Sequence, residues 1–134
     1  QPYEASFALT AAEADELLAR NHDDQLLNRI IAAYQELSRQ YDFVLCLGSD
    51  SDEGASLFEF NLGVEVARSL DSPVLLLSSG HGRSMDEIAG TLRQARDAFL
   101  AKGCPVVAYV VNKVEPDRLE AIGDAVAADL ELAP

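Results

Sequence analysis

The stretch that decides the fold is Tyr41–Asp50 (YDFVLCLGSD), in which five consecutive apolar residues end at a glycine. A continuous apolar run between turn signals is typical of a strand that is buried on both faces, as in a parallel sheet. Two later runs have the same character, PVLLLS at 73–78 and PVVAYVV at 105–111. We therefore predict strands over residues 42–48, 73–78 and 105–111.

Helical patterns alternate with these strands. The apolar stripe from Leu26 to Leu37 and the stretch from Leu57 to Leu70 each predict an amphipathic helix. A capping box at Thr10-x-x-Glu13 predicts the start of a short helix that ends near residue 20. A second capping box at Ser84-x-x-Glu87 predicts the start of a longer helix that stops at Gly103. Pro116 falls near the first position of a final helix. This alternation predicts an α/β fold whose ligands lie at the carboxyl ends of the strands.

Length and composition limit the class of protein. The 134 residues fit one domain, and no apolar stretch approaches the roughly 20 residues of a membrane helix. The net charge of −13 argues against nucleic acid and anionic membranes as partners. No secretory signal opens the chain, and a first residue other than Met suggests a processed product or an excised fragment. Cys46 and Cys104 fall in or beside predicted strands, so we expect two buried thiols in a reducing cytoplasm.

Two loops that follow predicted strands have alternative interpretations. The acidic loop Gly48–Ala55 carries Asp50, Asp52 and Glu53, which could hold Mg²⁺, but the spacing differs from that of a calcium loop and favours a solvated loop. We assign no metal ligand there. The loop from Ser78 to Ser84 (SSGHGRS) could bind an anion at a helix N-terminus, or could be a tight connection in which Ser84 caps the helix.

Neither loop supplies a catalytic group. The loop from Ser78 to Ser84 lacks the Gly-Lys-Ser/Thr of a Walker A sequence. His81 has no nucleophile that the sequence assigns to it, so no catalytic residue is predicted.

The pair Asn112–Lys113 closes the third predicted strand. In nucleotide-binding α/β proteins an asparagine amide in this place can bond the edge of a base, while the lysine stem covers the ring. An ordinary strand-to-helix turn is the alternative.

Three blocks carry a resemblance to a known family: DFVLCLGSD (42–50), FNLGVEVARSLDSPVLLLSSG (60–80) and PVVAYVVNKV (105–114). From about residue 34 to 114 the chain resembles the amino-terminal domain of long bacterial phosphate acetyltransferases, a domain similar to dethiobiotin synthetase. The resemblance implies a three-layer α/β/α fold of the P-loop NTPase type with a mainly parallel sheet.

Two departures from the family are informative. The family's domain begins with a strand and a P-loop that are not found here, and Leu47 stands where relatives tend to carry a glutamate. Phosphoryl chemistry needs a phosphate cradle and a metal, so we do not expect this chain to hydrolyse a nucleotide. Without that strand, residues 42–48 and 73–78 must pair directly or leave an apolar edge, which would favour self-association.

The resemblance implies a non-catalytic regulatory or structural domain of an enzyme that transfers an acetyl group between acetyl-CoA and phosphate. It implies a crevice for a nucleotide or metabolite effector, lined by Gly48, Ser79, Gly80, Asn112 and Lys113. The expected partners are the rest of the parent enzyme, which would use coenzyme A, and further copies of the chain in a homo-oligomer. The alternatives are an autonomous nucleotide-binding protein of the dethiobiotin synthetase type and a plain interaction domain.

Overall fold

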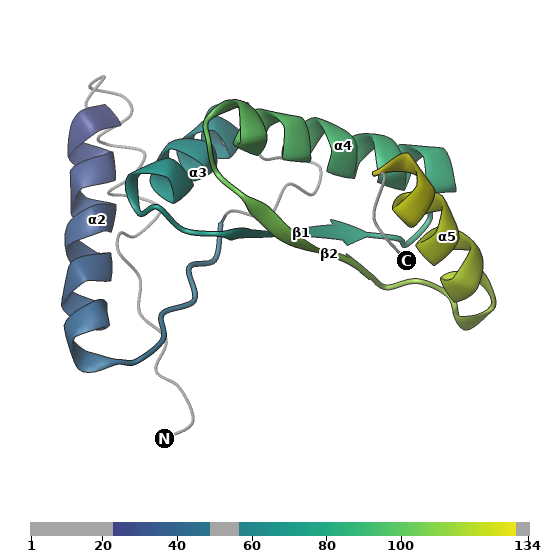
Figure 1. Cartoon of the computed structure of the whole chain (residues 1–134), viewed down its shortest axis with the longest axis horizontal. Helices are drawn as coiled ribbons and strands as arrows, with labels where there is room; N and C mark the ends of the chain where they lie inside the picture. The colour runs from purple at the N-terminus through teal and green to yellow at the C-terminus, as the bar shows by residue number, and fades with distance from the viewer. Residues whose placement is uncertain (1–22, 49–56, 131–134) are drawn as a thin grey trace. The chain divides into compact units, whose positions relative to one another are not determined.

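The computed structural model of the chain describes residues 23–48 and 57–130 (Figure 1). The chain divides into two compact units, residues 1–70 and residues 71–134. Among the described helices, none combines the length and the apolar character that crossing a membrane requires. The capping box predicted at Thr10 and the short helix predicted after it lie outside the described residues.

The first unit holds two helices that contact each other, α2 (Asp23–Gln40) and α3 (Leu57–Ser69). Both were predicted from their apolar spacing, and each buries one of the described side chains almost fully, Leu26 in α2 and Val64 in α3. The opposite side of α2 is polar. Glu36 accepts hydrogen bonds there from Arg39 and Gln40 at 3.3 and 2.8 Å.

The predicted strand at 42–48 is wrong, because these residues form no strand in the structure. Phe43, Leu45 and Leu47 are 80, 70 and 88% exposed. A strand exists only where a neighbour accepts and donates its backbone hydrogen bonds, and the regular elements among the described residues of the first unit are the helices α2 and α3. Cys46 is exposed, against the prediction, while Cys104 is buried as predicted.

The second unit has a parallel sheet of two described strands, β1 (Val74–Ser79) and β2 (Val106–Asn112). They are joined through α4 (Met85–Ala101) and followed by the 3₁₀ turn η1 (Pro116–Arg118) and α5 (Leu119–Asp129). The register places Leu76 beside Tyr109 and Ser79 beside Asn112. The α/β class with a parallel sheet, predicted from alternating apolar runs and helices, is confirmed.

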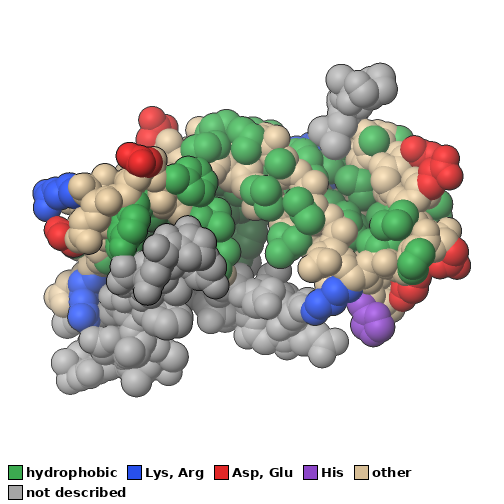
Figure 2. Space-filling model, turned by 90° about the horizontal axis from the view of Figure 1, so that it is seen from below, with side chains coloured by type: hydrophobic (Ala, Val, Ile, Leu, Met, Phe, Trp, Pro, Cys, Tyr) green, Lys and Arg blue, Asp and Glu red, His purple; other side chains and the backbone are tan. Residues whose placement is uncertain are grey.

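One face of this sheet is covered by α4, and α5 packs on α4 (Figure 1). Along β1 the side chains alternate, with Leu76 and Ser78 buried and Leu75 and Leu77 exposed. Figure 2 shows that hydrophobic side chains reach the surface on the side of the molecule seen from below. The sequence predicts burial of both faces, whereas the described residues bury one. The buried apolar side chains of this unit are Leu76, Ile88, Ala89, Leu92, Phe99, Cys104, Ile122, Val126 and Leu130.

Both ends of α4 follow the predicted signals. The backbone N–H of Ser84 donates to Glu87 Oε2 at 2.8 Å, and the Glu87 N–H donates to Ser84 Oγ at 3.3 Å, which completes the capping box. At the other end Lys102 is the C-cap, and Gly103 takes the left-handed backbone that favours glycine, with φ of 78°. Local side-chain chemistry therefore fixes where the helix begins and ends.

The capping box predicts an acid-sensitive contribution to stability. Hydrogen bonds from the backbone and hydroxyl of Ser84 lower the pKa of the Glu87 carboxyl below its ordinary value of 4.5. A group whose pKa is lowered in the folded state contributes stability above its unfolded pKa, and the contribution disappears as pH falls through the folded value. We expect Glu87→Gln, which does not titrate, to reduce the acid dependence of the free energy of unfolding below about pH 4.5.

Urea unfolding of the wild type and of Glu87→Gln, between pH 3 and 7 in small steps, measures this difference. Ser84→Ala should show an intermediate acid dependence, because it keeps the backbone bond and loses the hydroxyl bond. Glu120→Gln is the control, since Glu120 is an exposed carboxylate in the first turn of α5, a helix without a side-chain cap. If the free energy of unfolding falls equally with acid in the wild type and in Glu87→Gln, the prediction is contradicted.

Candidate functional site

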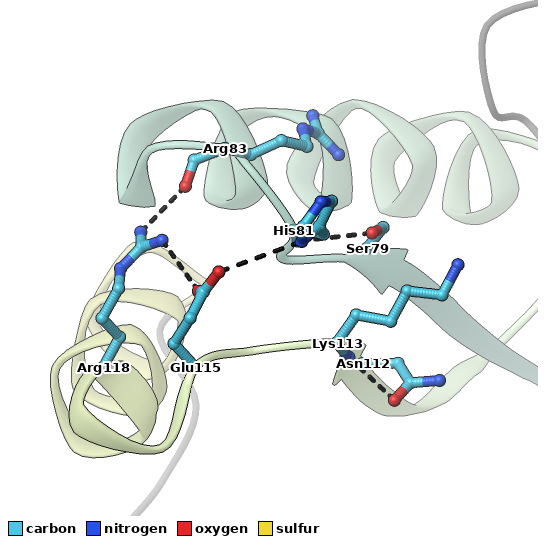
Figure 3. Close-up of polar contacts among 7 residues, drawn as sticks. All are labelled: Ser79, His81, Arg83, Asn112, Lys113, Glu115 and Arg118. Carbon is cyan, nitrogen blue, oxygen red and sulfur yellow. Dashed lines mark hydrogen bonds and ion pairs between the residues drawn. The ribbon is translucent and has the colours of Figure 1, made fainter.

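The carboxyl ends of β1 and β2 bring four of the five predicted site residues together: Ser79, Gly80, Asn112 and Lys113. Figure 3 shows Ser79, Asn112 and Lys113 at these strand ends. Ser79 and Asn112 are register partners at the last position of each strand. The Gly80 N–H continues the pairing by donating to the Asn112 carbonyl oxygen at 2.7 Å. We call this group the strand-end site. Gly48, the fifth predicted site residue, belongs to the first unit.

Gly80 is required by crowding where the two strands end. A Cβ atom at this position would lie 2.6 Å from Val114 Cγ2, 3.3 Å from Val111 Cγ1 and 3.4 Å from the Asn112 carbonyl oxygen. At Gly48, by contrast, an added Cβ would meet no atom within 4 Å. Gly80 therefore sets how closely the loop after β1 approaches the end of β2.

Asn112 and Lys113 form a strained turn with free polar groups. Lys113 has φ of 56°, a left-handed conformation that is uncommon for residues other than glycine, and the Lys113 N–H donates to Asn112 Oδ1 at 2.8 Å. Within the described residues, the Asn112 amide nitrogen and the Lys113 ammonium have no hydrogen-bond or ion-pair partner, and both side chains are exposed. Strained backbone is often kept where it positions functional groups.

The loop from Ser78 to Ser84 is a tight connection, and its charged groups are already engaged. The Arg83 guanidinium donates to Ser78 Oγ at 3.1 Å, to Thr91 Oγ1 at 2.6 Å and to the Glu87 carbonyl oxygen at 3.0 Å. The Ser84 hydroxyl belongs to the capping box, and the Glu87 carboxylate already lies at the N-terminus of α4. The alternative in which Ser84 caps the helix is confirmed, and Arg83 is committed to contacts within its own loop and helix.

A second set of contacts, which the sequence did not reveal, joins the two loops. Arg118 Nη2 donates to the Arg83 carbonyl oxygen at 2.8 Å, and Arg118 Nη1 donates to Glu115 Oε2 at 3.3 Å. His81 Nδ1 lies 3.9 Å from Glu115 Oε1, so the described partner of this histidine is a carboxylate (Figure 3). We call Arg118 with Glu115, His81 and Arg83 the interloop link. Its one sequence signal is the three-residue spacing of Glu115 and Arg118, which is compatible with an ion pair at the start of a helix.

Within the described residues, no group of three or more His, Cys, Asp and Glu side chains is arranged to hold a metal ion. The acidic residues Asp50, Asp52 and Glu53 lie outside the described part of the chain.

The relatives of the chain are phosphate acetyltransferases. It is 37% identical over 117 residues to the phosphate acetyltransferase of a Synechocystis species, covering 87% of this chain and 17% of that protein. It is 32% identical over 123 residues to the phosphate acetyltransferase of Nitratidesulfovibrio vulgaris, a match that covers 90% of this chain and 18% of that protein. It is 28% identical over 111 residues to the phosphate acetyltransferase of Pseudomonas putida, a match that covers 82% of this chain and 16% of that protein. The chain thus spans less than a fifth of the length of these relatives. No solved structure is significantly similar to it.

These similarities confirm the resemblance to the amino-terminal domain of long phosphate acetyltransferases that the three sequence blocks carried. They also confirm the fold class, a three-layer α/β/α fold of the P-loop type. The AAA domain family matches residues 1–131, nearly the whole sequence, and the chain therefore belongs to that family.

Proposed function

We propose that this chain is a non-catalytic regulatory domain of a phosphate acetyltransferase, and that it binds a nucleotide-type effector at the strand-end site. The names of its relatives support the parent enzyme. In this proposal the rest of that enzyme uses coenzyme A, and the acetyl transfer between acetyl-CoA and phosphate takes place there. The domain acts in the cytoplasm, as part of a homo-oligomer.

The observation that carries the proposal is the free amide and ammonium of Asn112 and Lys113 on a left-handed turn. The amide nitrogen has two N–H groups to donate, while its oxygen is held by the backbone of the turn. It can therefore bond an acceptor on the edge of a base, the lysine stem can cover the ring, and the ammonium can reach an anionic group.

The engaged groups favour a nucleotide-type effector over inorganic phosphate. A phosphate site needs several converging donors, whereas Arg83 is committed and the N-terminus of α4 already carries the Glu87 carboxylate. One lysine is a weak cradle for a phosphate alone. For the same reason, we propose binding without hydrolysis.

Asn112→Asp tests the site directly. Aspartate keeps the oxygen that accepts from the Lys113 N–H and so preserves the turn, but it removes both amide donors and adds a negative charge. We expect the affinity for the effector to fall at least about tenfold, the loss associated with one hydrogen bond to a buried partner. The measurement is calorimetric titration with Mg²⁺·ATP, NADH and pyruvate in turn, with light scattering to follow the molecular mass.

Two further variants complete the test. Lys113→Gly removes the ammonium and relieves the left-handed strain, so weaker binding with unchanged or higher stability would separate the chemical role of Lys113 from its structural one. Gln94→Ala is an exposed change on α4 and should bind like the wild type. Saturable binding that is equal in the wild type and Asn112→Asp would refute this site. No binding of any of the three compounds would refute the effector function and favour the plain interaction domain.

A further inference from the structure

We infer that Arg118 is a positioning residue for the strand-end site, holding the loop after β1 in register with the loop after β2. The inference rests on the proposed function, because it concerns the affinity of that site. Arg118 lies at the junction of η1 and α5 and is partly buried. It touches none of the groups that we propose to contact the effector, so its effect has to be transmitted through the backbone.

The hydrogen bonds make a closed path between the loops. Arg118 donates to the Arg83 carbonyl oxygen at 2.8 Å, and the Arg83 N–H donates to the Gly80 carbonyl oxygen at 3.4 Å. The Gly80 N–H donates to the Asn112 carbonyl oxygen at 2.7 Å. From Asn112 the chain runs on through Lys113 to Glu115, whose carboxylate accepts from Arg118 at 3.3 Å. Arg118 thus closes a ring that includes both halves of the strand-end site (Figure 3).

Breaking the ring at Arg118 should loosen the two loops beyond the hydrogen bond that joins Gly80 to Asn112. The proposed contacts come from Ser79 and Gly80 on one loop and from Asn112 and Lys113 on the other, and binding is strongest when such groups are already in place. Without Arg118 the hydrogen bond from Gly80 to the Asn112 carbonyl oxygen still joins the halves at the strand ends. Farther out, a contact between the described loop residues is the His81–Glu115 pair at 3.9 Å, with side chains 79 and 45% exposed. An exposed pair at that distance holds little on its own. Without Arg118, ordering of the loops would have to accompany effector binding.

Arg96 offers a matched control. Its Nη1 donates to the Leu130 carbonyl oxygen at 3.3 Å, so like Arg118 it joins distant parts of the second unit through a partly buried guanidinium–carbonyl bond. It belongs to neither loop of the strand-end site. Arg96→Ala should therefore cost stability of the same kind as Arg118→Ala, while leaving the geometry of the strand ends unchanged.

The experiment compares the wild type, Arg118→Ala, Arg118→Lys and Arg96→Ala, using NADH as the probe and its fluorescence as the readout. We expect Arg118→Ala to weaken NADH binding about tenfold and Arg96→Ala to change it less than about twofold at equal loss of thermal stability. Arg118→Lys keeps a donor for the Arg83 carbonyl oxygen but cannot donate to Arg83 and Glu115 at once as the guanidinium does. Its affinity for NADH should therefore lie between those of Arg118→Ala and the wild type. Equal weakening by Arg118→Ala and Arg96→Ala would overturn the inference.

A second readout needs no ligand. In ¹H–¹⁵N spectra of the free protein, Arg118→Ala should shift the amide resonances of Gly80 and Lys113, and Arg96→Ala should leave them in place. Resonances of Gly80 and Lys113 that stay unchanged in Arg118→Ala would overturn the inference even if NADH binding weakened. If the wild type does not bind NADH but these resonances move, the nucleotide function fails, while the positioning of the loops by Arg118 is supported.

Discussion

Leu92→Ala is expected to destabilise the second unit by about 2–5 kcal/mol, the range for removing a buried leucine side chain from a packed core. Leu92 is 2% exposed and lies in the middle of α4, the helix that covers the sheet. Its loss would leave a cavity in the packed core of the second unit. Urea unfolding at neutral pH, followed by far-ultraviolet circular dichroism, measures the change.

Leu100→Ala is the matched control on the same helix. Leu100 is 52% exposed, so the same substitution removes less buried area and should cost well under half as much. Equal losses at the two positions would mean that α4 does not present the face described here to the core. A smaller loss for Leu92→Ala than for Leu100→Ala would contradict the packing outright.

Gly80→Ala is expected to cost about 1–3 kcal/mol, as overpacking generally does. The added methyl group would lie 2.6 Å from Val114 Cγ2, and valine has little rotational freedom with which to move aside. The loop after β1 would therefore have to retreat from the end of β2, which weakens the hydrogen bond from Gly80 to the Asn112 carbonyl oxygen. Thermal unfolding measures the change in stability. The amide chemical shifts of the residues next to Gly80 show whether the loop has moved away from the end of β2.

Gly123→Ala is the control with the opposite sign. Gly123 lies inside α5, where an added Cβ would meet no atom within 4 Å. Alanine is favoured over glycine in a helix interior by about 0.5–1 kcal/mol, so this variant should be more stable than the wild type. A Gly80→Ala protein as stable as Gly123→Ala would show that the strand ends are less crowded than this geometry requires.

The sequence predicted the helices well because their signals are local. The capping box at Ser84 and Glu87 and the glycine at 103 act on residues within a turn or two of themselves, and the structure follows them. Strands depend on a partner elsewhere in the chain. The apolar run at 43–47 has the composition of a strand but forms none, whereas residues 74–79 and 106–112 pair with each other.

The candidate site also has one part that the sequence predicted and one part that depends on distant contacts. That Ser79 and Asn112 would lie together followed from one rule, since neighbouring parallel strands end at the same edge of a sheet. The role of Arg83 and the link through Arg118 did not follow, because they depend on distances between residues 35 apart in the chain. A loop rich in glycine, serine and arginine looks like an anion site until the partners of its arginine are known.

The Glu87 carboxylate at the start of α4 has a consequence for selectivity. The helix end that would attract a phosphate group is already neutralised by a side chain of the protein, so an anionic tail meets only one flexible lysine at the strand ends. Under the function proposed above, discrimination among effectors must then come from the uncharged part of the effector. Compounds that share a base and differ in the length of their phosphate tails should compete for the domain on nearly equal terms.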